Sequence, residues 1–173
     1  MITLRCTQKL LKRLGAPSNN ETQPPTSVLG DWYANLIYTR PQQLVMCMNE
    51  RSLLMVLLTA RHSSTLTARF RQSVLALLYR LKVPLSFIEA EASAMQEIQI
   101  GRTASRHVVG CMVEAAKTLE YKLRDGEFQT FEDVEDKFCE FLYESVGYRY
   151  PRELALELFS LGSSSGERNL RIN

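Results

Sequence analysis

Two hydrophobic periodicities alternate along this chain of 173 residues, and their order limits the folds open to it. Residues 2–6 alternate between apolar and polar side chains, as a half-buried strand does. Residues 8–14 then carry leucines at helical spacing, between Thr7, which suits a helix N-cap, and Gly15, which suits a helix end. The same exchange of patterns continues to about residue 161. Strands interleaved with helices predict an α+β fold.

An antiparallel hairpin is predicted early in the chain. Residues 31–39 and 43–49 have strand character and are joined at residues 40–42, where a proline favours a turn. The short apolar run 52–59 fits a strand or a helix, and we favour the strand. Residues 96–102 alternate as a last strand. We therefore expect a small antiparallel sheet, with a mixed sheet left open as the alternative.

Helices are predicted after the hairpin and throughout the C-terminal third. The segments with apolar residues at helical spacing are 64–82, 85–94, 103–124, 131–145 and 151–161. The last of them is expected to end at Gly162, because glycine commonly closes a helix. Several helices should therefore pack on the sheet.

Two segments are expected to lie outside the packed part of the chain. Residues 16–30 are rich in proline, serine, asparagine and threonine, which predicts a mobile surface loop. Residues 161–173 are mostly polar and predict a disordered tail. The remainder, residues 1–160, has the length of a single domain.

The composition excludes several classes of protein. No apolar run approaches the ~20 residues of a membrane helix, and the N-terminus lacks the order of a secretory signal. We therefore expect a cytoplasmic protein without membrane association. No metal-binding, nucleotide-binding or hydrolase motif is present, so no metal, cofactor or catalytic residue is predicted. The cysteines, none of them in a C-x-x-C pair, are expected to be reduced and buried: Cys6, Cys47, Cys111 and Cys139.

The net charge of +2 conceals a sorting of charges along the chain. Residues 1–82 carry a charge of +8, whereas residues 83–173 carry −6. The basic half either faces an anionic partner such as nucleic acid or packs against the acidic half. The two alternatives stay open for the basic helix predicted between Arg61 and Lys82, and we favour internal pairing.

One local exception to this sorting suggests an anion site. Arg102 and Arg106 flank the point where a predicted strand passes into a helix N-terminus, which disfavours cations. A phosphate or carboxylate there would accept hydrogen bonds from the helix N–H groups and from an arginine. We predict an anion site at Arg102, Thr103 and Arg106. The alternative is that these arginines pair with acids of the C-terminal half, such as Glu132 or Glu135.

The hairpin holds a second candidate pocket. Trp32 and Tyr33 point to opposite faces of their strand, and Asn35 shares the face of Tyr33. If the first strand pairs here, Arg5 joins them. A pocket floored by Tyr33 and Asn35 is one interpretation. A helix that packs over this face is the other, and we favour it.

Five ordered segments resemble an uncharacterised bacterial family, the domain of unknown function 6933. They are Arg5–Leu11, Asp31–Leu36, Asn49–Leu54, Thr103-x-x-Arg106-x-Val108-x-Gly110 and Tyr148-Arg149-x-Pro151. The resemblance extends to about Phe159 and implies a bacterial cytosolic protein of one such domain. It supplies no activity, cofactor or catalytic residue. It favours a shared site among the matching residues Arg5, Trp32, Asn35, Asn49, Thr103 and Arg106.

These observations favour a non-enzymatic binding or accessory protein with an anion-recognising surface. Its ligand would be a phosphate-containing molecule or nucleic acid. One alternative is a metal-independent ribonuclease of toxin–antitoxin type, with Arg102, Arg106 and His107 stabilising the transition state and Tyr33 as acid or base. The family pattern has a small residue at position 107, which argues against that role for His107. An oligomer-forming interaction module is a further alternative, and a homo-oligomer stays open.

Overall fold

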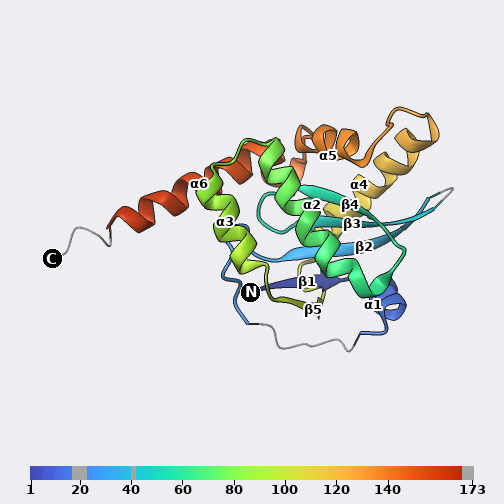
Figure 1. The fold of residues 1–173 in the computed structure, drawn as a ribbon. Helices are drawn as coiled ribbons and strands as arrows, with labels where there is room; N and C mark the ends of the chain where they lie inside the picture. The colour runs from blue at the N-terminus through green and yellow to red at the C-terminus, as the bar shows by residue number, and fades with distance from the viewer. Residues whose placement is uncertain (17–22, 40–41, 169–173) are drawn as a thin grey trace.

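The computed structural model describes residues 1–16, 23–39 and 42–168, and Figure 1 shows their arrangement. The elements follow in the order β1 (Ile2–Cys6), α1 (Gln8–Leu14), β2 (Trp32–Tyr38), β3 (Gln43–Asn49), β4 (Met55–Thr59), the 3₁₀ turn η1 (Ser63–Thr65), α2 (Leu66–Arg80), α3 (Leu85–Ala94), β5 (Ile98–Arg102), α4 (Arg106–Arg124), α5 (Phe131–Cys139), the 3₁₀ turn η2 (Glu144–Val146) and α6 (Pro151–Arg168). None of these helices combines the length and the apolar character that crossing a membrane requires.

Within the described residues, five strands form one sheet in the order β4-β3-β2-β1-β5. The predicted hairpin is confirmed, because β2 pairs antiparallel with β3 in a register that joins Trp32 to Asn49 and Tyr38 to Gln43. The strand favoured for residues 52–59 is confirmed as β4. β1 runs parallel to both of its neighbours, β2 and β5. The fold is therefore α+β with a mixed sheet.

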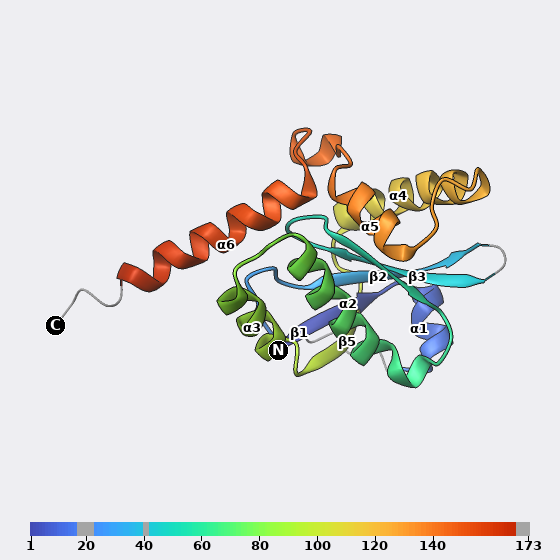
Figure 2. The ribbon, with the colours of Figure 1, turned by 45° about the horizontal axis from the view of Figure 1, so that its top comes forward.

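Strand alternation divides the interior into two cores, one on each face of the sheet (Figure 2). Trp32 of β2 points into the first core, which α1, α2 and α3 cover. Its ring packs edge-on against the ring of Phe70, with 5.4 Å between the ring centroids. The next residue, Tyr33, points into the second core beneath α4 and α5. Both faces of the central strands are buried, so their sequences are nearly continuous apolar runs.

Two predicted helix ends are wrong. α5 ends at Cys139 instead of residue 145, because Phe141 and Tyr143 both pack into the second core, and two positions apart on a helix they would face opposite ways. α6 continues past Gly162 to Arg168. One glycine costs a helix only about 1 kcal/mol, so it need not end it.

The predicted mobile loop and tail are described only in part, since residues 17–22 and 169–173 lie outside the described residues. The end of the loop is anchored. Thr26 donates its N–H to the carbonyl of Met1, and the Ser27 hydroxyl donates to the buried carboxylate of Glu91 at 2.6 Å. The single-domain boundary at residue 160 stays a prediction.

A side chain of α5 closes the outer edge of β4. Glu135 accepts the Leu57 N–H at 2.9 Å and a guanidinium N–H of Arg80 at 2.6 Å. Burial raises the pKa of Glu135, while the bonds from Leu57 and Arg80 act in the opposite direction. Arg80 also pairs with Asp136 at 3.0 Å. Here the basic half of the chain pairs with the acidic half, and the cation that pairs with Glu135 is Arg80.

Arg80→Met should lower the free energy of unfolding by about 2 kcal/mol at neutral pH, because Glu135 would stay buried without its cation. Arg80 lowers the pKa of this buried carboxyl, so the pKa rises further above its ordinary 4.5 in the variant, and the folded variant takes up a proton at a higher pH than the folded wild type does. The deficit should therefore shrink as the pH falls from about 7 towards 5. Urea titrations at both pH values measure it.

Arg61→Met removes the same charge from an exposed position and serves as the control. A deficit that is equal for the two variants, or independent of pH, would contradict the role given to Glu135.

Candidate functional site

The chain changes sides of the sheet between two adjacent parallel strands. β1 leads into α1, whose Leu10 lies in the first core, and β5 leads into α4, whose Val108 lies in the second. The carboxyl ends of β1 and β5 point the same way, and the chain leaves them towards opposite faces. Open α/β sheets bind ligands in the crevice that such a divergence creates. The topology therefore marks the carboxyl ends of β1 and β5 as a candidate site.

A pocket of about 610 Å³ lies at this place. Its described lining comes from the end of β1, from α1 and the turn after it, and from the end of β5: Cys6, Gln8, Leu11, Lys12, Gly15, Ala16, Arg102 and Thr103. The volume is that of a small-molecule site. We call this set the crevice pocket. Two members are cationic, and these described lining residues include no acid and no histidine.

Cys6 lines the crevice pocket, but its thiol is not a nucleophile. Its side chain is buried, and its thiol donates a weak hydrogen bond to the carbonyl of Leu4 at 3.6 Å. Burial raises the pKa of this thiol to about 12. A thiol of that pKa stays protonated at neutral pH, and only the thiolate attacks electrophiles.

The turn that carries Arg102 and Thr103 is held from the α4 side of the sheet. The Tyr33 hydroxyl accepts the N–H of Ser105 at 3.1 Å, and Ser105 caps α4 by accepting the Val108 N–H at 3.3 Å. Arg5 donates a longer hydrogen bond, 3.4 Å, to the carbonyl of Arg102. Because burial raises the pKa of Tyr33, this hydroxyl stays neutral and keeps the turn in place.

The predicted anion site is divided by the structure. Arg102 and Thr103 line the crevice pocket, whereas Arg106 is exposed on the first turn of α4 and does not belong to the described lining. Lys12 and Gln8 were missed by sequence reasoning. They lie about 90 residues from Arg102 in the chain, and only the pairing of β1 with β5 brings them together.

The second predicted site is spread over both faces of the sheet. Trp32 lies in the first core. Tyr33 lies beneath α4, and the Asn35 side-chain oxygen accepts a hydrogen bond from the Thr7 hydroxyl at 3.0 Å. Arg5 and Asn49 belong instead to a network of polar contacts around Asp31. These five predicted residues therefore do not line one common cavity.

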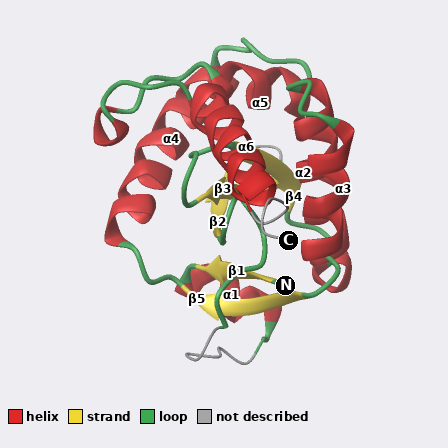
Figure 3. Ribbon diagram, turned by 90° about the vertical axis from the view of Figure 1, so that its left-hand side faces the viewer, coloured by secondary structure: helices red, strands yellow, loops and turns green. Residues whose placement is uncertain are grey.

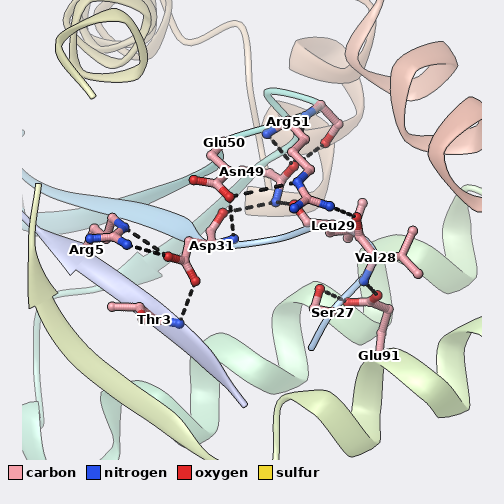
Figure 4. Close-up of polar contacts among 11 residues, drawn as sticks. Thr3, Arg5, Ser27, Val28, Leu29, Asp31, Asn49, Glu50, Arg51 and Glu91 are labelled. Atoms are coloured by element: carbon pink, nitrogen blue, oxygen red, sulfur yellow. Dashed lines mark hydrogen bonds and ion pairs between the residues drawn. The ribbon is translucent and has the colours of Figure 1, made fainter. Parts of the chain in front are cut away.

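Asp31 is the centre of that network (Figure 4). One carboxylate oxygen accepts the backbone N–H of Thr3 at 2.8 Å. The other accepts two guanidinium N–H groups of Arg5, at 2.9 and 2.8 Å. The Asp31 N–H donates to the carboxylate of Glu50 at 3.0 Å. No sequence pattern singles out Asp31, although it begins one of the five resembling segments.

Asn49 fixes the turn between β3 and β4 from inside the protein. It is fully buried, and its amide donates to the carbonyl of Leu29 at 2.9 Å. Its oxygen accepts both the N–H and the hydroxyl of Ser52, at 2.9 and 2.8 Å. Every polar group of this side chain is used within the fold, so Asn49 supports the structure rather than an open pocket.

A family model described as a domain of unknown function, DUF6933, matches residues 3–154. The chain belongs to this family. Comparison with curated proteins gives no match. The matched range contains the Asp31 network and the crevice pocket, so both are features of the DUF6933 domain of this chain.

Asp31→Ala should lower the free energy of unfolding by about 3 kcal/mol, because it removes the acceptor of the Thr3 N–H and the carboxylate that pairs with the partly buried Arg5. Chemical denaturation measures the loss. Asp125→Ala, at an exposed carboxylate, is the control and should change stability by less than about 0.5 kcal/mol. Similar losses in the two variants would show that the network does not carry this weight.

Proposed function

We propose that this DUF6933 protein is a non-enzymatic binding protein for a small organic anion carrying a phosphate or a carboxylate. The observation that carries the proposal is the crevice pocket at the carboxyl ends of β1 and β5, with Lys12 and Arg102 in its lining. A concave site with a few polar groups is the usual form of a small-molecule site. Its cations come from two different elements and meet in one cavity.

The cationic side chains in the lining favour a ligand of negative charge. Lys12 and Arg102 contribute ammonium and guanidinium N–H donors to this cavity. Gln8 and Thr103 add neutral donors. Hydrogen bonds from cations to phosphate or carboxylate oxygens are about twice as strong as neutral ones. An anion therefore gains more here than a neutral molecule of the same shape.

Size decides that the anion is organic. A volume of about 610 Å³ is far larger than an inorganic phosphate requires. Leu11 and Ala16 line part of the wall, and they suit an apolar portion of the ligand. The ligand class is thus a phosphorylated or carboxylated metabolite, with the anionic group held by Lys12, Arg102 and Thr103.

The ribonuclease alternative has less support. Tyr33 would have to act as acid or base, but its side chain is buried and its hydroxyl accepts a hydrogen bond from the Ser105 N–H. Burial also raises the pKa of this hydroxyl, which makes it a poorer acid near neutral pH. The described lining of the crevice pocket contains no aromatic side chain on which a base could stack. Binding without chemistry is the function that these residues support best.

Lys12→Gln and Arg102→Gln should each weaken ligand binding about tenfold, since each removes one charge-assisted hydrogen bond. The probes are inorganic phosphate, a nucleoside monophosphate, a sugar phosphate and a dicarboxylate, each with its neutral analogue. Thermal shift identifies the binders and calorimetry gives their dissociation constants. The organic anions should stabilise the protein more than inorganic phosphate does.

Lys9→Gln makes the same change on the same short helix, outside the described lining, and should leave binding unchanged. Arg106→Gln separates the crevice pocket from the helix N-terminus predicted from sequence: it should have little effect. If Arg106→Gln abolishes binding while Lys12→Gln does not, or if none of the anions shifts the melting temperature, the crevice pocket is not the site.

A further inference from the structure

The turn that follows β4, residues 59–62, is held through its backbone by two arginines from different helices. Arg69 of α2 donates to the carbonyls of the first, third and fourth residues of the turn, at 3.0, 2.6 and 3.2 Å. Arg13 of α1 donates to the remaining carbonyl at 3.0 and 3.3 Å. His62 is fixed in the left-handed region, with φ at 54°. The turn therefore presents the exposed side chains of Arg61 and His62 from a fixed backbone.

A row of exposed cations adjoins this turn. Figure 3 shows α2 and α3 on one side of the sheet and α4 on the other, and α1 covers the first core together with α2. Lys9, Lys12 and Arg13 are exposed on α1. The bonds from Arg13 to the turn place Arg61 beside this helix. We call Lys9, Lys12, Arg13 and Arg61 the basic row.

The basic row is not neutralised by ion pairs within the described residues, since none of its four members forms one there. Residues 1–82 contain three acids. The Asp31 N–H donates to the carboxylate of Glu50 at the other end of β2, and Glu21 lies outside the described residues. An anionic partner would therefore find available cations along α1 and the turn.

An exposed aromatic ring lies at the side of the basic row. Tyr38, the last residue of β2, is 58% exposed, and the Lys9 ammonium lies 5.9 Å from the centroid of its ring. Single-stranded nucleic acids are held by this combination, because phosphates contact the cations and a base stacks on the ring. A membrane-binding surface places apolar side chains among its cations, whereas the exposed neighbours here, Gln8 and Ser63, are polar.

We propose that the basic row and Tyr38 bind single-stranded nucleic acid, with phosphates on Lys9 and Arg61 and a base on the ring of Tyr38. Lys9 and Arg13 are one helical turn apart, about 6 Å along the axis of α1, so the cations follow one another along a path. The fixed backbone of the turn lowers the entropy that Arg61 loses on binding.

Other basic side chains of the N-terminal half are engaged within the fold. Arg69 holds the turn, and Arg80 pairs with Glu135 at 2.6 Å. Arg5 pairs with Asp31 at 2.8 Å. The contact with nucleic acid therefore belongs to α1 and the turn, while the arginines of α2 support the structure.

The probes are fluorescein-labelled oligouridylate and oligothymidylate, about 15 nucleotides long, and a duplex of equal length. Lys9→Gln and Arg61→Gln should each weaken single-strand binding about fivefold and reduce the slope of log Kd against log salt by about 0.7. Lys117→Gln removes the same charge from an exposed position on α4 and should bind as the wild type does. Fluorescence anisotropy measures each affinity.

Tyr38→Ala should weaken the single strands about tenfold, whereas Tyr38→Phe keeps the ring and keeps the affinity. The duplex should bind more weakly than the single strands and should not respond to Tyr38→Ala, because its bases are already stacked. Circular dichroism melts establish that each variant is folded.

The proposal is overturned if neither single strand binds at about 50 mM salt, or if Lys9→Gln and Arg61→Gln bind as tightly as Lys117→Gln does. It is also overturned if the duplex binds best. Binding to phosphatidylserine vesicles without binding to the oligonucleotides would show a membrane surface instead.

The crevice pocket shares Lys12 with the basic row, so the variants tested here are taken from outside the described pocket lining. Arg102→Gln should lose the small organic anion and retain the oligonucleotides. A failure of every small anion to bind would leave the oligonucleotide result unaffected, and the two proposals can therefore fail separately.

Discussion

The carboxylate of Asp31 joins β1 to β2, two parallel neighbours at the middle of the sheet. It stands directly before β2 and accepts hydrogen bonds from the backbone of Thr3 and the side chain of Arg5, both in β1. β1 and β2 are parallel and separated by α1 and a long connection, so no tight turn fixes their register. A buried carboxylate that bonds to two residues of the neighbouring strand provides that register. On its other side, Asp31 bonds to Glu50, which follows β3.

The position of the candidate site depends on this placement of β1. With β1 between β2 and β5, the carboxyl ends of two parallel strands meet, and the chain leaves them for opposite faces of the sheet. Lys12 and Arg102 then line one cavity. The hydrogen bond from Ser105 to Tyr33 sets the turn after β5. Tyr33 of the hairpin thus lies beneath the site, whereas Lys12 of α1 and Arg102 of β5 line the crevice pocket.

The edge of the sheet at β4 is where the acidic and basic parts of the chain meet. Glu135 and Arg80 close the β4 edge and join the acidic part of the chain to the basic part. Other arginines of the basic part are also used within the fold: Arg69 donates to the carbonyls of Thr59 and Arg61. Several of the charged side chains of the basic half are therefore engaged in ion pairs and hydrogen bonds within the fold. Arg71 differs in that its buried Nε–H has no acceptor in the described part of the chain.

The sequence by itself determined the identity and order of the elements, because hydrophobic periodicity and capping residues act within a few positions. β1, the hairpin and α3 lie where their patterns predict. Only the tertiary structure decided the parallel place of β1, the meeting of Lys12 with Arg102, and the end of α5 at Cys139. These depend on contacts between residues far apart in the chain, and no local pattern encodes which of several apolar faces meet. Arg102 and Thr103 could be chosen from their position at a strand end, whereas Lys12 became a candidate only when α1 and β5 were seen to share a cavity.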